Sequence, residues 1–280
     1  MIPETSDLMQ LHSLYYKSPS QLPKGNVLVV GAGSSGAQIA EELSLVGDGR
    51  KIFLSVGGHN RPPRSYRGRD FCWWLGVLNE WDDEATENNK HVTIAVSGAR
   101  GGQTMDFRRL AAQGITLLGH ADGFAGGKVL ISNDLRENIR RGDENYLSVL
   151  DQADEFIARN GLDLPEEPEA RDFLPDPSCL VDPVLELDLE ANGITSIIWA
   201  TGFRNDYSWI SSTKALGSAK KPSHRRGVSD EPGIYFLGLP WQTRRGSSFI
   251  WGVWHDAKHV ADHIAKQRGY AMYRPGVVKN

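Results

Sequence analysis

Residues 26–45 read NVLVVGAGSSGAQIAEELSL, and this stretch predicts a strand, a glycine-rich turn and a helix in direct succession. Residues 27–30 are all apolar, as in a short buried strand. Residues 37–45 continue with apolar positions at helical spacing. Because the pattern Gly-x-Gly-x-x-Gly lies between a strand and a helix, it predicts a dinucleotide-binding turn. The chain contains this combination once.

Each glycine of this turn has a separate predicted role. Gly31 permits the tight turn, Gly33 lets the backbone approach a pyrophosphate, and Gly36 lets the helix pack closely on the strand. Ser34 and Ser35 lie at the helix N-terminus, where unpaired N–H groups and the helix dipole attract phosphate. The simpler interpretation is a buried strand–turn–helix whose glycines bind no ligand.

The second strand of the predicted unit, residues 51–56, indicates which nucleotide is bound. Units that bind NAD place Asp or Glu at the end of this strand, to hold the ribose 2′-hydroxyl. Here the strand ends near Ser55, and no carboxylate follows until Asp70. Four arginines follow instead: Arg61, Arg64, Arg67 and Arg69. Guanidinium groups bind phosphate through paired, charge-assisted hydrogen bonds. We therefore predict NADPH, with Ser55, Arg61 and Arg64 as contacts; the alternative is a solvated basic loop.

Composition places the chain among globular proteins with one large domain or two ordinary ones. It has 280 residues, of which 40% are hydrophobic and 24% charged. The net charge of −4 argues against a general nucleic-acid binder. Cys72 and Cys179 lack metal-site spacing and are expected to be free thiols of a reducing compartment. No signal peptide and no apolar run of roughly 18 residues is present, so we expect a cytoplasmic protein without membrane contact.

The remaining pattern predicts an α/β fold. We expect strands at residues 91–96, 115–118, 194–200 and 233–238, and helices at 71–81, 106–112, 134–160 and 256–266. Gly126 and Gly127 lie between two short apolar runs and predict a hairpin turn. His255, His259 and His263 share one helix face, but no further ligand spacing supports a metal site, and none is predicted.

Six separated stretches add a family pattern: residues 11–16, 31–36, 63–70, 198–203, 235–241 and 245–248. In this order they resemble the flavin-containing monooxygenases and their bacterial and fungal relatives. The resemblance implies a doubly wound, Rossmann-like NADPH-binding unit and a remnant of a second, FAD-type dinucleotide-binding unit. Residues 1–25 would be an N-terminal linker, residues 26–200 the NADPH-binding domain with its long helix, and residues 201–280 the C-terminal part of the FAD-type domain. Relatives begin with another glycine motif that holds FAD, and this sequence is expected to lack that unit.

The resemblance also implies site residues. Thr201 and Gly202 mark the return toward the FAD-type unit and are expected cofactor contacts. The expected flavin-side wall lies in the C-terminal tail, with Gln242 and Arg245 as catalytic candidates and with Ser247, Ser248 and Asp256. The alternative interpretation of these residues is ordinary packing and helix capping.

Two functions remain open at this point. The first is an NADPH- and FAD-dependent monooxygenase-like oxidoreductase that acts on a small organic molecule, in which the cofactors carry the chemistry. The second is an NADP(H)-binding protein without its own flavin chemistry: inactive, non-redox, or one half of a flavoenzyme. Trp241, Trp251 and Trp254 in the tail could line a pocket, build core, or cover surface that an FAD unit would otherwise bury. An exposed apolar patch would favour a homo-oligomer or a partner that supplies an FAD domain.

Overall fold

The structure is a computed structural model that describes residues 8–86 and 93–273. The described residues form two compact units. Unit 1 comprises those within Met1–Phe71 and His91–Gly202, and unit 2 those within Cys72–Lys90 and Phe203–Asn280. This division differs from the domains expected from the sequence, because residues 72–86 cluster with the C-terminal part of the chain.

A five-stranded parallel sheet forms the centre of unit 1, in the order β1-β10-β2-β3-β6. Its strands are β1 (Met9–His12), β2 (Asn26–Val30), β3 (Ile52–Ser55), β6 (Thr116–Leu118) and β10 (Ile194–Trp199). The central strand β2 is the apolar run that precedes the glycine turn. The first strand lies in the segment expected to be a linker, but it pairs with β10 at the edge of the sheet.

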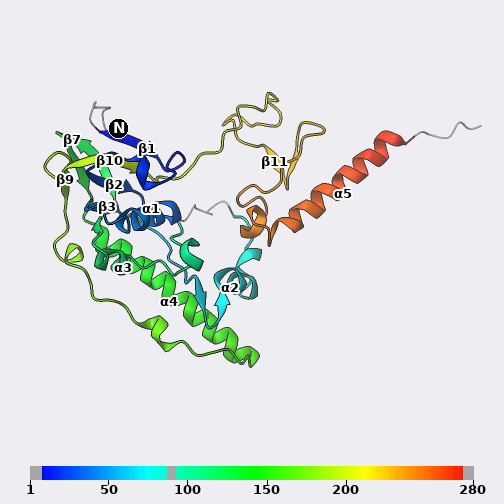
Figure 1. The fold of residues 1–280 in the computed structure, drawn as a ribbon. Coiled ribbons are helices and arrows are strands. Elements are labelled where there is room, and N and C mark those ends of the chain that lie inside the picture. Colours follow the sequence, from blue (N-terminus) through cyan, green and yellow to red (C-terminus); the bar gives the residue numbers. More distant parts are fainter. Residues whose placement is uncertain (1–7, 87–92, 274–280) are drawn as a thin grey trace, which may run out of the picture. The chain divides into compact units, whose positions relative to one another are not determined.

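The two faces of this sheet are covered differently (Figure 1). Val27 and Val29 of β2 face a core shared with α1 (Ser34–Ser44), α3 (Phe107–Ala112) and the start of α4 (Leu135–Asn160). Leu28 and Val30 face a second core, shared with an antiparallel sheet. That sheet consists of β7 (Ala121–Ala125), β8 (Lys128–Ile131) and β9 (Glu186–Asp188). The α/β class is confirmed. The doubly wound arrangement is not, since a hairpin and β9 lie on the second face of the sheet.

Several predicted elements have the expected positions. Gly126 and Gly127 turn the β7–β8 hairpin with φ values of +57° and +80°, which favour glycine. The long helix α4 ends at Gly161, whose left-handed conformation is a common helix stop. Asp134 precedes this helix, but its carboxylate accepts the N–H of His120 instead of capping.

Among the described residues, two predicted strands are not formed. Residues 91 and 92 lie outside the described residues, and Ile94 makes only an isolated bridge to Asn60. Within residues 233–238, Tyr235 makes only an isolated bridge to Val228. A strand needs a neighbour along its whole length, and the described residues provide none there.

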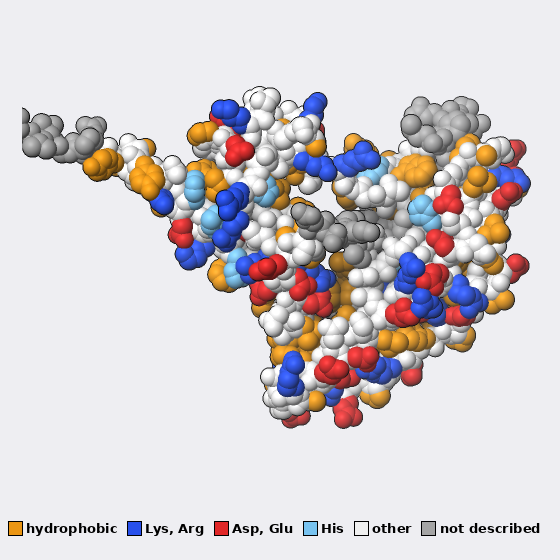
Figure 2. Space-filling model, turned by 180° about the vertical axis from the view of Figure 1, so that it is seen from behind, with side chains coloured by type: hydrophobic (Ala, Val, Ile, Leu, Met, Phe, Trp, Pro, Cys, Tyr) orange, Lys and Arg blue, Asp and Glu red, His pale blue; other side chains and the backbone are white. Residues whose placement is uncertain are grey.

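The remaining elements are short, apart from the last helix. They are β4 (Ser65–Tyr66), β5 (Arg69–Asp70), α2 (Phe71–Val77), β11 (His224–Arg225), β12 (Val228–Ser229) and α5 (Val253–Met272). The 3-10 turns are Pro19–Gln21, Glu80–Asp82, Ala99–Gly101, Pro168–Arg171, Ser178–Leu180 and Arg245–Ser248. No helix in the described part of the chain has the length and apolar character needed to cross a bilayer. Basic and acidic side chains are interspersed on the face drawn in Figure 2.

The packing of Gly36 gives a first testable prediction. A Cβ atom at this position would lie 1.8 Å from the carbonyl oxygen of Gly31, which is backbone and cannot rotate away. We expect Gly36→Ala to lower the free energy of unfolding by about 3 kcal/mol or more. Gly269→Ala is the control, because it lies in α5 with no atom within 4 Å of the added Cβ. Urea unfolding should show a loss for the first variant only, and equal stability of both would contradict this account.

Candidate functional site

The glycine turn lies where the parallel strands end, the edge at which ligands bind in open α/β sheets. Gly31 has a φ of +102°, and a Cβ there would lie 2.5 Å from the carbonyl oxygen of Ala200, just after β10. Gly36 lies against Gly31 itself. The end of β2, the start of α1 and the end of β10 are therefore in backbone contact, and Gly31 and Gly36 have the geometric roles predicted for them.

Part of the turn is covered by residues 93–96. The N–H and the hydroxyl of Ser34 both donate to the carbonyl of Ile94, at 3.0 Å and 2.9 Å. The Ser34 hydroxyl also accepts the N–H of Val96. A Cβ on Gly33 would lie 3.0 Å from the Thr93 methyl group. Residues 93–96 thus pack against Gly33 and Ser34, a contact that the sequence did not indicate.

The next two N–H groups of the helix remain open. Within residues 8–86 and 93–273, no hydrogen-bond acceptor meets the N–H of Ser35 or of Gly36. Ser35 is exposed, whereas Gly36 is buried. Buried peptide N–H groups are nearly always paired, and those at a helix N-terminus attract anions. Ser35 and Gly36 are therefore donors of this turn that can bind phosphate.

Ser55 has a structural position. Its side chain is buried, with 2% of the residue exposed, and its hydroxyl donates to the carbonyl of Gly119 at 2.9 Å. The same oxygen accepts the N–H of Ala121 at 3.1 Å. Ser55 therefore fastens β3 to the chain that follows β6, and it has no hydroxyl hydrogen left for a cofactor.

Arg61, predicted to bind a 2′-phosphate, is buried instead, with 3% of the residue exposed. Its guanidinium donates to Asp143 at 2.8 Å and to the carbonyl of Met105 at 3.0 Å, and it stacks 4.4 Å from the ring centre of Tyr146. Asp143 also binds Arg108 at 2.7 Å. Arg61 is therefore part of an internal ion-pair network, and its position does not fit a ligand contact.

Arg64 has the more open position. Its guanidinium, 30% exposed, pairs with the carboxylate of Asp70. Gly102 lies directly beside it, since a Cβ there would come within 2.7 Å of Nε. Arg67 instead donates to Asp154, the carboxylate that also accepts the Tyr66 hydroxyl. Of the two predicted phosphate ligands, Arg64 is the one with an accessible cation.

The Tyr66 hydroxyl donates to Asp154, the same carboxylate that Arg67 binds. Burial, followed by the hydrogen bond to Asp154, raises the pKa of Tyr66 to about 12. The phenol therefore stays protonated at neutral pH and remains a donor to Asp154. Tyr66 and Arg67 thus anchor the segment between Arg64 and Asp70 to α4.

Thr201 and Gly202 are exposed at the same edge of the sheet. The carbonyl of Gly202 lies 3.0 Å from Nε2 of His12, at the end of β1. The N–H of Leu14 donates to Nδ1 of the same ring, so Nε2 carries the hydrogen and donates to Gly202. His12 therefore holds the chain that leaves β10 against the end of β1.

The predicted flavin-side residues make internal contacts of unit 2. Gln242 binds the backbone of Phe236 and Leu239, and the buried Ser247 hydroxyl accepts the N–H groups of Thr243 and Arg244. Arg245 pairs with Glu80. Asp256 is fully buried; one oxygen accepts the Thr243 hydroxyl at 2.6 Å, and the other has no partner among the described residues. These side chains fit packing and turn formation, and they do not present a wall for a flavin.

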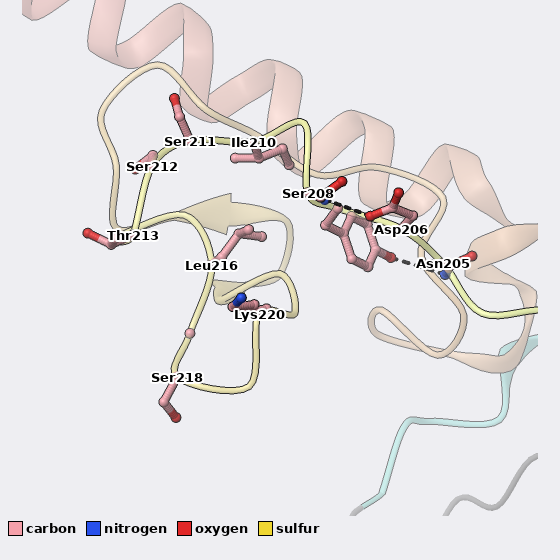
Figure 3. Close-up of a pocket in the computed structure, with 12 residues that line it drawn as sticks. Asn205, Asp206, Ser208, Ile210, Ser211, Ser212, Thr213, Leu216, Ser218 and Lys220 are labelled. Atoms are coloured by element: carbon pink, nitrogen blue, oxygen red, sulfur yellow. Dashed lines mark hydrogen bonds between the residues drawn. The ribbon is translucent and has the colours of Figure 1, made fainter.

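A depression of about 640 Å³ lies in the loop of residues 205–220 in unit 2 (Figure 3). The Tyr207 hydroxyl accepts the side-chain amide of Asn205, and Asp206 accepts the N–H of Ser208. None of the residues lining it is a predicted cofactor contact. In the described part of the chain, no three His, Cys, Asp or Glu side chains gather to hold a metal ion.

Arg61 is buried whereas Arg64 is partly exposed, and this difference gives a second prediction. Asp143→Asn leaves Arg61 buried without its counter-charge, and we expect it to cost about 3 kcal/mol of unfolding free energy. Asp70→Asn removes the more exposed partner of Arg64, and we expect a cost below about 1 kcal/mol. Urea denaturation of both variants tests the difference. A large loss for Asp70→Asn with none for Asp143→Asn would reverse the assignment of the two pairs.

Comparison with known proteins finds relatives that are named as oxidoreductases. No protein-family model matches it. It is 33% identical over 259 residues to a Geobacillus kaustophilus oxidoreductase named CzcO-like, covering 91% of this chain and 57% of the relative. It is 30% identical over 264 residues to the oxidoreductase CzcO of Bacillus subtilis, covering 93% and 59%. This chain therefore spans less than two thirds of the length of these relatives.

A flavin-containing monooxygenase from Stenotrophomonas maltophilia is similar in structure, with a TM-score of 0.47 and 14% identity. The match covers 93% of this chain and 55% of that one. The relatives by sequence are oxidoreductases, and the similar solved chain is a flavin monooxygenase. In sequence, the chain is similar to the CzcO-type oxidoreductases over more than nine tenths of its own length.

Proposed function

We propose that this chain is an NADPH-dependent, flavin monooxygenase-like oxidoreductase that acts on a small organic molecule. The observation that carries the proposal is the pair of open N–H groups, Ser35 and Gly36, at the end of the central parallel strand. The redox character of the relatives supports it. Because the chain covers 57% to 59% of those relatives, the activity of a whole protein of this type is part of the proposal.

NADPH would bind with its diphosphate on the N–H groups of Ser35 and Gly36 and on the exposed Ser35 hydroxyl. Ser34 would contribute indirectly, because Ile94 already accepts its N–H and hydroxyl. Arg64 would bind the 2′-phosphate through its guanidinium, and the phosphate would compete with Asp70 for that cation. Thr201 and Gly202 would border the cofactor at the end of β10.

Bound NADPH supplies a hydride, and in proteins of this kind a flavin accepts it. The four predicted flavin contacts in unit 2, Gln242, Arg245, Ser247 and Asp256, are engaged in internal bonds and do not fit a flavin ring. This observation favours a second candidate function, an NADP(H)-binding protein that does not hold its own flavin. In that case a partner chain would carry the FAD.

The two candidates differ in what the purified chain binds. We would record the visible spectrum of the chain and then titrate it with NADPH and with FAD in separate calorimetric experiments. Binding of both cofactors, with NADPH oxidation in the presence of oxygen, supports the flavin-dependent function. Binding of NADPH alone supports the second candidate, and failure to bind either nucleotide contradicts both.

Arg64→Ala is the direct test of nucleotide choice. Loss of a charge-assisted contact of about 1.5–3 kcal/mol should weaken NADPH binding roughly 10- to 100-fold. NADH lacks the 2′-phosphate, so its affinity should change by less than about twofold. Arg159→Ala, at an exposed position near the end of α4, is the control and should leave both affinities unchanged. Equal losses for NADPH and NADH on Arg64→Ala would remove the 2′-phosphate assignment.

A further inference from the structure

A second concavity lies in unit 1, on the face of the parallel sheet that the antiparallel sheet covers. Its volume is about 530 Å³, within the range of sites for small organic molecules. Its apolar lining comes from Val30 at the end of β2, Trp199 at the end of β10, and Phe124 and Val129 of the β7–β8 hairpin. We call it the hairpin pocket.

The hairpin pocket lies on the opposite face of the central sheet from α1, although its lining includes Thr201, a predicted cofactor contact. Val30 belongs to the core beneath the antiparallel sheet, whereas Val29, its neighbour in β2, belongs to the core beneath α1. Side chains of consecutive strand residues point to opposite faces. The central sheet therefore separates the pocket from α1, and no residue of the turn at 31–36 lines the pocket.

The apolar lining suits a flat ring. The indole N–H of Trp199 donates to the side-chain oxygen of Gln10 at 3.2 Å, which fixes the orientation of that ring. Phe124 packs at the edge of the same core and adds a second aromatic surface. Aromatic side chains bind flat, apolar rings by offset or edge-on packing. A planar aromatic group is thus the best match to this part of the pocket.

The polar part of the lining carries a negative charge. Asp122 is the one acidic residue among those that line the pocket, and neither Lys nor Arg is among them. The carboxylate accepts the Ser132 hydroxyl and lies 3.0 Å from Nδ1 of His120. The hydrogen bond from Ser132 lowers the pKa of Asp122 most, and the one with His120 lowers it further, so this pKa lies below its usual range. The side chain is 54% exposed and can accept further hydrogen bonds.

We propose that the hairpin pocket binds a planar aromatic molecule with a protonated amine, its ring packed against Trp199 and Phe124 and its ammonium group at Asp122. Such a ligand matches both the apolar lining and its single charge. Binding at this site needs neither NADPH nor a flavin, so the proposal goes beyond the function proposed above and can hold or fail separately.

Three probes that share a naphthalene ring test this proposal by calorimetry on the whole chain: 1-naphthylmethylamine, 1-naphthylmethanol and 1-naphthoate. We expect the amine to bind about two- to fivefold more tightly than the alcohol, since an ion pair with an exposed carboxylate contributes little. The carboxylate should bind more weakly than the alcohol because it faces Asp122. Equal affinity of all three probes would overturn the proposal.

Two variants locate the binding. Asp122→Asn should remove the preference for the amine over the alcohol but keep binding of the alcohol. Thr201→Trp, at an exposed lining residue, should fill the pocket and weaken all probes at least tenfold. Glu190→Gln is the control, an exposed acid of unit 1 outside the lining, and should bind as the original chain does. Unchanged probe affinities in both Asp122→Asn and Thr201→Trp would show that binding occurs elsewhere.

Discussion

The close approach of three backbone segments governs unit 1. Gly36 of α1 lies so near the carbonyl of Gly31 that no side chain fits between them, and Gly31 in turn lies close to the carbonyl of Ala200 after β10. These contacts fix the helix N-terminus at the end of the central strand. The N–H groups of Ser35 and Gly36 at this N-terminus have no protein acceptor among the described residues.

The different cover of the two sheet faces has a functional consequence. The helical face carries the turn whose open N–H groups suit phosphate, together with the arginine-containing chain that follows β3. The face beneath the antiparallel sheet carries an apolar concavity with one carboxylate, Asp122. The parallel sheet thus has an edge that suits anions and, on its other face, a pocket that suits a cation. His12, which lines this pocket, links the end of β1 to the chain that follows β10.

Local patterns predicted local structure well. The glycine turn, the hairpin at Gly126 and Gly127, and the helix ending at Gly161 follow from the conformations that these residues allow. The role of Arg61 could not be predicted, because its partner Asp143 lies 82 residues away. The antiparallel sheet was missed for a similar reason, since β9 pairs with the hairpin across a long connection. In the tail, Gln242 and Ser247, predicted to face a flavin, instead bind the backbone of nearby residues, and residue type alone does not reveal this difference.

The central claim is that the N–H groups of Ser35 and Gly36 bind a dinucleotide diphosphate. Amide NMR of isotope-labelled chain during an NADPH titration measures these two groups directly. The account predicts that the Ser35 and Gly36 resonances shift most, and that Ser34, already bound to Ile94, shifts less. NADPH binding that leaves the Ser35 and Gly36 resonances unchanged, while amides elsewhere shift, would contradict it.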